Sequence, residues 1–121
     1  MYEVEVEICF PASHQVKLAG SELEALHEHE WRARAKLAGE TLSLDGILVD
    51  FILVKQILEE IADKFRGKDL GKVRILPGEN PTAENFARYF YEQLEGRFGS
   101  EVRLLEVAVQ EAQGCWAVYR P

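Results

Sequence analysis

Polar and apolar residues alternate strictly over two stretches near the start of the chain. Residues 2–10 place Tyr, Val, Val, Ile and Phe at the even positions and glutamates at positions 3, 5 and 7. Residues 30–38 repeat the pattern, with Trp, Ala, Ala and Leu alternating with Arg32, Arg34 and Lys36. Since successive side chains of a strand point to opposite faces, each stretch predicts a half-buried β-strand. The outer face is acidic on the first strand and basic on the second, which predicts that the two are antiparallel neighbours.

A stretch with apolar residues at helical spacing follows. It begins after Asp50, a favourable N-cap, and predicts a helix of about four turns that ends at Arg66-Gly67. Its apolar stripe consists of Phe51, Val54, Leu58, Ile61 and Phe65. Residues 68–79 carry no such period and are predicted to be a loop or irregular.

A second helical stretch begins near residue 80. Asn80 is expected to be its N-cap and Pro81 its first helical residue, because proline suits that position. We expect Gly96 or Gly99 to end this helix. The residues expected to face a core are Ala83, Phe86, Ala87, Phe90 and Leu94.

The C-terminal part predicts a hairpin of two more strands. Residues 102–111 and 115–119 flank a turn at Gln113-Gly114. The order strand, strand, helix, helix, strand, strand is typical of an α+β fold with an antiparallel sheet, here four-stranded with both helices on one face. Such a sheet keeps two free edges, which association with further subunits would close. With 121 residues, the chain fits a single domain over residues 1–121.

Charge and composition exclude several classes of partner. The net charge is −7, and no basic cluster interrupts the acidic sequence, which argues against nucleic acid and anionic membranes. No run of residues approaches the 18 or so apolar positions of a membrane span. Because the sequence begins directly with a charged strand, we expect no signal peptide and a cytoplasmic protein. The two cysteines, Cys9 and Cys115, form no disulfide framework and are interpreted as small structural hydrophobic residues.

The histidines provide the candidate chemistry. His27 and His29 are two positions apart, so on a strand their imidazoles point to the same face. His14 shares the parity of the apolar face of the first strand, if that strand continues past Pro11. Three neutral imidazoles with one open position are a catalytic zinc arrangement. The alternative interpretation is that these are surface or core histidines near a loop.

Glu111 is a second unusual position. It continues the apolar parity of residues 105–109, and a carboxylate on an apolar strand face needs a partner. The alternative is that the strand has already ended and that this carboxylate is solvated.

Several short motifs, taken together, resemble the 6-pyruvoyl-tetrahydropterin synthase family, which includes the 6-carboxy-tetrahydropterin synthases of queuosine synthesis. Residues 10–14, FPASH, resemble the family's Phe-x-Ala-x-His segment, and residues 26–31, LHEHEW, resemble its Leu-His-Gly-His-x-Tyr segment. Residues 50–51 resemble the Asp-Phe that opens the family's first helix, and residues 80–85 match its Asn-Pro-Thr-x-Glu-Asn. Glu111 stands where the family has a late glutamate. The resemblance spans nearly the whole chain.

This resemblance implies a fold and an activity. The family's fold is the T-fold, whose subunits form barrels and usually hexamers, with the active sites between subunits. The implied activity is a zinc-dependent lyase reaction on the side chain of 7,8-dihydroneopterin or its triphosphate. By the same resemblance, zinc would be bound by His14, His27 and His29. Glu111 would accept hydrogen bonds from the pterin ring, and Thr82 and Glu84 would lie near the same pocket.

The sequence also departs from the family. Family enzymes carry a catalytic cysteine four or five residues before the first histidine of the pair, where this chain has Leu23 and Glu22. The family's Leu-Asp-His segment is absent, and no histidine follows His29. Glu24 resembles instead the branch of the family in which glutamate replaces the cysteine and the product is 6-hydroxymethyl-dihydropterin. Two alternatives stay open: Glu24 is a solvated loop acid, and the protein is a non-catalytic paralogue that binds zinc or a pterin-like ligand.

Overall fold

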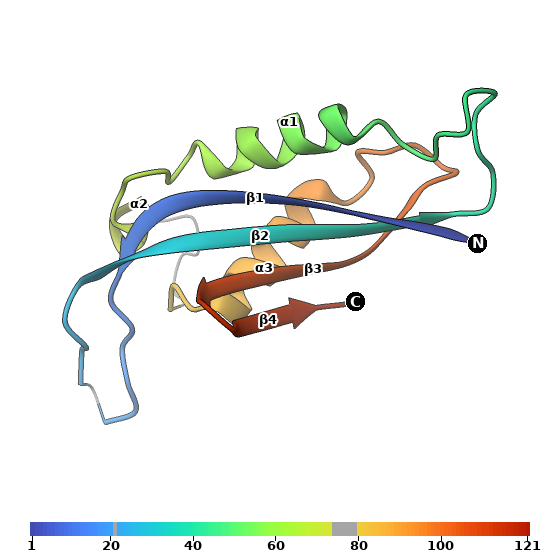
Figure 1. Cartoon of the computed structure of the whole chain (residues 1–121). Helices are drawn as coiled ribbons and strands as arrows, with labels where there is room; N and C mark the ends of the chain where they lie inside the picture. Colours follow the sequence, from blue (N-terminus) through green and yellow to red (C-terminus); the bar gives the residue numbers. More distant parts are fainter. Residues whose placement is uncertain (21, 74–79) are drawn as a thin grey trace.

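The computed structural model describes residues 1–20, 22–73 and 80–121. It contains one antiparallel sheet of four strands in the order β1-β2-β3-β4, and two longer helices and one short helix (Figure 1). The strands are β1 (Tyr2–His14), β2 (His27–Gly39), β3 (Arg103–Ala112) and β4 (Cys115–Tyr119). The helices are α1 (Phe51–Ala62), α2 (Leu70–Val73) and α3 (Ala83–Leu94). Helix α1 packs against β1, and α3 packs against β3 and β4, on one face of the sheet. The predicted α+β architecture is therefore confirmed.

Strands β1 and β2 pair as their charges predict. In the antiparallel register Glu5 lies opposite Lys36, and Glu7 lies opposite Arg34. The Glu7 carboxylate accepts from Arg34 at 2.9 Å and from Arg32 at 3.1 Å. Partly exposed pairs of this kind contribute only about 0.2–1 kcal/mol each, so they add little to the stability of the sheet.

The core fills the space between the apolar face of the sheet and the helices. Phe10 of β1 and Trp31 of β2 are opposite each other and almost fully buried. Against them pack the buried rings of Phe65, Phe86 and Phe90. Phe65 belongs to this core although α1 ends at Ala62, so the helical period continues as packing beyond the regular helix.

The helix starts were only partly predicted. Asp50 caps α1, and its carboxylate accepts from the Ile52 amide at 2.9 Å. The prediction that Asn80 caps α3 is wrong: Thr82 is the N-cap, and its hydroxyl accepts from the Asn85 amide at 3.2 Å. The helix begins two residues later than expected because the Asn80 side chain is bound to another segment. None of the helices in the described residues is long and apolar enough to cross a membrane.

Two further expectations need correction. Within the segment expected to be irregular, residues 70–73 form the short helix α2, whose first turn is stabilised by a hydrogen bond from the Gly71 amide to Asp69. Residues 74–79 lie outside the described part of the chain. Both Cys9 and Cys115 are exposed, which contradicts their interpretation as small structural hydrophobic residues. The pKa of Cys9 is raised, mainly by a hydrogen bond with Glu30 and then by burial and the nearby carboxylate charge.

Candidate metal centre

The register of β1 and β2 brings the three histidines together. His14 lies directly opposite His27, and His29 lies opposite Ala12, two residue pairs farther along the strands and on the same face. All three therefore extend the apolar face, at the end of the sheet that lies away from the N-terminus. His14 is fully buried, while the side chains of His27 and His29 are 36% and 25% exposed. The strand continues through Pro11 to His14, so the condition under which His14 shares the apolar face is met.

The side-chain atoms converge on one point. His14 Nε2 lies 2.9 Å from His27 Nε2 and 2.5 Å from Glu111 Oε1, and the same carboxylate oxygen lies 3.5 Å from His29 Nε2. One ligand atom from each of these four residues lies within 4.8 Å of all the others. Ligand atoms around a tetrahedral zinc ion are about 3.3 Å apart, given zinc–nitrogen bonds of about 2.0–2.1 Å. The spacing of the four residues therefore fits one such ion.

Backbone carbonyls fix the tautomers of two of these histidines. His14 Nδ1 donates to the Pro81 carbonyl at 2.7 Å, and His27 Nδ1 donates to the Ala25 carbonyl at 2.7 Å. A carbonyl oxygen can only accept, so in the neutral rings both Nε2 atoms carry lone pairs. When both rings are in that neutral form, their lone pairs and the Glu111 carboxylate repel one another. A cation removes this repulsion, and such second partners are typical of metal-ligating histidines.

Burial also favours the ligating form of His29. The pKa of His29 is lowered, chiefly because burial disfavours the charged imidazolium. The Glu111 carboxylate opposes this shift, whereas His27 and His14 reinforce it. Below the cluster, the Trp31 indole packs edge-on against His14 and donates to the Ala12 carbonyl at 3.1 Å. The indole thus separates the cluster from the core and keeps the β1 backbone in place.

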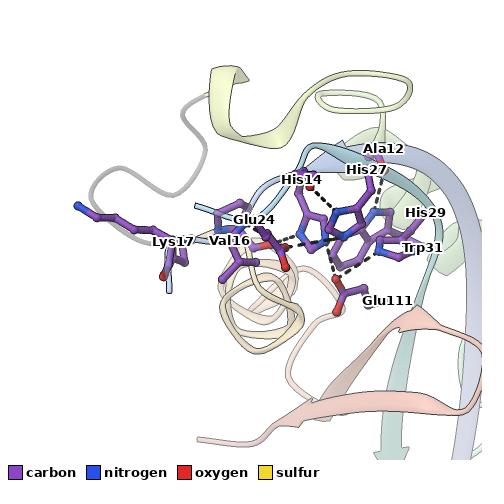
Figure 2. A network of polar contacts seen from close by, with 12 residues as sticks. Ala12, His14, Val16, Lys17, Glu24, His27, His29, Trp31 and Glu111 are labelled. Atoms are coloured by element: carbon purple, nitrogen blue, oxygen red, sulfur yellow. Dashed lines mark hydrogen bonds and ion pairs between the residues drawn. The ribbon is translucent and has the colours of Figure 1, made fainter. Parts of the chain in front are cut away.

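Glu24 lies beside the cluster, on a different side from Glu111. Figure 2 shows Glu24, from the β1–β2 connection, to one side of the imidazoles, and Glu111, from β3, below them. Glu24 Oε1 is 3.7 Å from His27 Nε2, and it accepts from the Val16 amide at 3.1 Å. About a third of this side chain is exposed, at 32%. The structure thus brings this carboxylate to the histidines rather than leaving it free in the connection.

The other candidate residues lie farther from the histidines or are engaged elsewhere. Thr82 follows Pro81, whose carbonyl holds His14, but the threonine hydroxyl is occupied as the cap of α3. Glu84 is exposed in the first turn of α3. Asp69, a conceivable substitute acid, binds the Gly71 amide instead.

Sequence reasoning missed two groups at this site, the carbonyls of Ala25 and Pro81. Backbone acceptors leave no signature in side-chain composition. In the sequence, only the Asn-Pro pair at residues 80–81 could have indicated that the Pro81 carbonyl lies at the site.

These features define an α+β protein with a histidine-rich centre that can hold a metal ion. A family model described as 6-pyruvoyl tetrahydropterin synthase matches residues 3–121. The chain belongs to the 6-pyruvoyl tetrahydropterin synthase family.

Individual relatives agree with this assignment. A protein of Pyrococcus horikoshii, provisionally named 6-carboxy-5,6,7,8-tetrahydropterin synthase, is 26% identical over 125 residues, covering 84% of this chain and 79% of that protein. The structure of 6-pyruvoyl tetrahydropterin synthase from Caenorhabditis elegans has a TM-score of 0.83 at 21% identity, covering 99% of this chain and 95% of that one. A Plasmodium vivax 6-pyruvoyltetrahydropterin synthase, described as a catalytic-residue variant with a glutamate replaced by alanine, has a TM-score of 0.70 at 13% identity, covering 100% and 99%. At these identities the two structures establish the shared fold.

Proposed function

We propose that this protein is a zinc-dependent lyase that acts on the side chain of 7,8-dihydroneopterin or its triphosphate. The observation that carries the proposal is the position of Glu24, with Oε1 3.7 Å from His27 Nε2 at the edge of a cluster of three histidines. Cleavage of a carbon–carbon bond next to a hydroxyl needs a base for that hydroxyl and a group that holds it. Family membership supplies the pterin as the substrate class. In this proposal residues 1–121 act as one domain.

The residues would divide the work as follows. His14, His27 and His29 would hold zinc through Nε2, leaving one position open. Bound zinc would supply a Lewis acid that lowers the pKa of a substrate hydroxyl. Glu24 would take the proton from that hydroxyl, since a group held at the cluster lies within reach of its carboxylate. The hydroxyl carbon would then leave as an aldehyde when its carbon–carbon bond breaks, and the electron pair of that bond would pass to the pterin fragment, which is reprotonated. The Val16 amide fixes the carboxylate at 3.1 Å and so keeps it aimed at the cluster.

Glu111 would bind the pterin ring rather than the metal. A carboxylate is acceptor-only and can take two N–H donors at once, as a pterin edge presents them. Three histidine ligands already complete the protein part of a catalytic zinc site, and a fourth protein ligand would close the open position. Thr82 and Glu84, at the start of α3, would line the same pocket.

The use of glutamate as the base has support from a relative. The Plasmodium vivax structure is described as a variant of a catalytic residue, and the residue replaced is a glutamate. Glu24 resembles the branch of the family in which glutamate replaces the catalytic cysteine, and this resemblance favours 6-hydroxymethyl-dihydropterin as the product. The name of the Pyrococcus horikoshii relative favours a 6-carboxy-tetrahydropterin product. We favour the first, because this chain has Leu23 and Glu22 where the cysteine would stand.

The test is the substitution Glu24→Gln, which keeps the size and the hydrogen bond from Val16 but removes the basic oxygen. We expect turnover to fall by about 10²–10⁴-fold, the usual contribution of a general base, while zinc content stays at the wild-type level. The control is Glu101→Gln, an exposed acid in the connection before β3, which should leave turnover unchanged. Undiminished turnover in Glu24→Gln would remove Glu24 from the mechanism.

A non-catalytic paralogue is the second candidate. The observation that favours it is the absence from the sequence of the family's cysteine at residues 22–23 and of any histidine after residue 29. Such a protein would bind zinc and a dihydropterin without converting it. Product formed in excess of the protein would contradict this alternative.

We also propose a homo-oligomer, a hexamer by the family resemblance, with its sites between subunits. Strands β1 and β4 are the free edges of the sheet. A hollow of about 500 Å³ lies between the start of β1 and the start of α1, and is lined mainly by apolar side chains. Phe51 and Ile52, in its wall, are 58% and 67% exposed. Adjoining exposed apolar residues of this kind mark association surfaces.

A further inference from the structure

The Asn80 side chain joins two segments of chain that are far apart in sequence. Its Oδ1 accepts from the Lys17 amide at 3.0 Å, and its Nδ2 donates to the Lys17 carbonyl at 2.9 Å. The Asn80 side-chain amide thus binds both the N–H and the C=O of Lys17, in the way that the backbone of a neighbouring strand binds both groups of one residue. The pair links the β1–β2 connection to the start of α3.

Asn80 is itself fixed from the side of α3. Its carbonyl accepts from the Thr82 amide at 2.8 Å and from Asn85 Nδ2 at 2.8 Å. The side chain of Asn85 therefore ties residue 80 to the first turn of the helix. Residue 80 has little freedom to move relative to α3.

Two groups of the proposed site depend on this anchored segment. On one side, the next residue, Pro81, holds His14 Nδ1 at 2.7 Å. On the other side, Lys17 adjoins Val16, whose amide donates to Glu24 Oε1 at 3.1 Å. The Val16 carbonyl also accepts from the Glu24 amide at 3.1 Å. Hydrogen bonds thus link both the buried His14 and the proposed base, Glu24, to the same short segment at the start of α3.

We infer that Asn80 is a positioning residue, which sets Glu24 relative to His14 through the backbone of Lys17 and Val16 and through Pro81. The inference rests on the proposed function. Hydrogen bonds that orient a metal-ligating histidine typically change metal affinity or activity by about 10–100-fold when they are disturbed. A residue that only fastened two loops would affect stability alone.

The experiment compares Asn80→Ala with Lys17→Ala. The first substitution removes both hydrogen bonds. The second serves as the control, because both hydrogen bonds from the Asn80 side chain go to the Lys17 backbone and the Lys17 side chain takes no part in them. Zinc affinity is measured by chelator competition, and kcat and KM are measured on zinc-saturated protein.

For Asn80→Ala we expect zinc affinity and kcat each to fall by about 10–100-fold, with Lys17→Ala at wild-type values. On the Glu24→Gln background, Asn80→Ala should reduce the residual kcat by less than about threefold, because the residue it positions has lost its basic oxygen. If Asn80→Ala does not fold, Asn80→Asp replaces it. That variant keeps the bond from the Lys17 amide, loses the bond to the Lys17 carbonyl, and should give a smaller loss of the same kind.

Three results would contradict the inference. Zinc affinity and kcat within about twofold of wild type would show that Asn80 does not position the site. An equal loss of kcat with and without the basic oxygen of Glu24 would show that Asn80 acts independently of that residue. A wild-type protein that binds no zinc would contradict the proposed function and the inference together, whereas the first two results leave the proposed function intact.

Discussion

Glu111 has two possible roles at the level of the single residue, and they predict different losses. Its carboxylate lies 2.5 Å from His14 Nε2, close enough to be a fourth metal ligand, yet a catalytic site needs an open position. We assign it to the pterin ring. For Glu111→Gln we therefore expect KM to rise at least about tenfold, because one ring N–H loses a charged acceptor, while zinc affinity stays within about threefold.

Titration calorimetry with zinc and steady-state kinetics separate the two roles. His29→Ala is the matched reference, since it removes a proposed ligand and should lower zinc affinity without a selective effect on KM. A Glu111→Gln protein with zinc affinity as low as that of His29→Ala would make Glu111 a metal ligand and overturn its assignment to the pterin.

The sequence predicted the histidines better than the acids around them. His27 and His29 are two positions apart, so their side chains share a face of β2 whatever the bounds of that strand. His14 joins them only because β1 is an edge strand, which tolerates Pro11, and because the Pro11 carbonyl is bound by the Gly67 amide. The place of Glu24 depends on its hydrogen bonds with Val16 in an irregular connection, and no periodicity describes those.

At the level of elements, the end of β2 is tightly packed around Gly39. A Cβ on Gly39 would lie 2.6 Å from Leu48 Cδ1 and 2.8 Å from the Glu101 carbonyl oxygen. The backbone oxygen cannot give way as a flexible side chain can. We expect Gly39→Ala to destabilise the protein by about 1–3 kcal/mol, the usual range for overpacking.

Gly71 provides the control in urea unfolding. It lies in α2, and a Cβ there would meet only Asp69 Oδ1, at an ordinary 3.5 Å. Gly71→Ala should therefore be neutral or stabilise by up to about 1 kcal/mol. A Gly39→Ala protein whose unfolding midpoint matches the wild type would show that the end of β2 relaxes easily.

The elements themselves were predictable where one periodicity dominated. Alternation over residues 2–10 and 30–38 predicted β1, β2 and their antiparallel pairing, because the apolar faces and the opposite charges both favour these two strands as neighbours; the register itself came from the structure. Helix α2 was missed because four residues contain too little of a period to detect. The start of α3 was misplaced because asparagine both caps helices and pairs with distant backbone, and Asn80 does the second.

For the whole molecule, the exposed apolar surface at the start of α1 predicts self-association. Ile52, 67% exposed, would be buried between subunits, so Ile52→Glu would place an unpaired charge there. We expect this variant to shift the protein to smaller species in light scattering coupled to size-exclusion chromatography, while Ile52→Val stays assembled. If Ile52→Glu leaves the mass in solution unchanged, this surface is not an interface.

The overall architecture followed from the element order, but its assembly could not be derived from one chain. The edges at β1 and β4 and the apolar hollow indicate that surfaces remain to be covered, and a sequence gives no direct information about what covers them. The metal centre also has surface that another subunit could cover, since the His27 side chain is 36% exposed in the single chain.

Turnover on zinc-loaded protein is the most direct test of the proposed lyase activity. Dihydroneopterin and its triphosphate are offered separately, and the pterin products are resolved by chromatography beside a metal-free control. We expect 6-hydroxymethyl-dihydropterin to form in excess of the protein and only when zinc is present. Zinc-loaded protein that binds the dihydropterin but releases no product would contradict it and make the chain a binding paralogue.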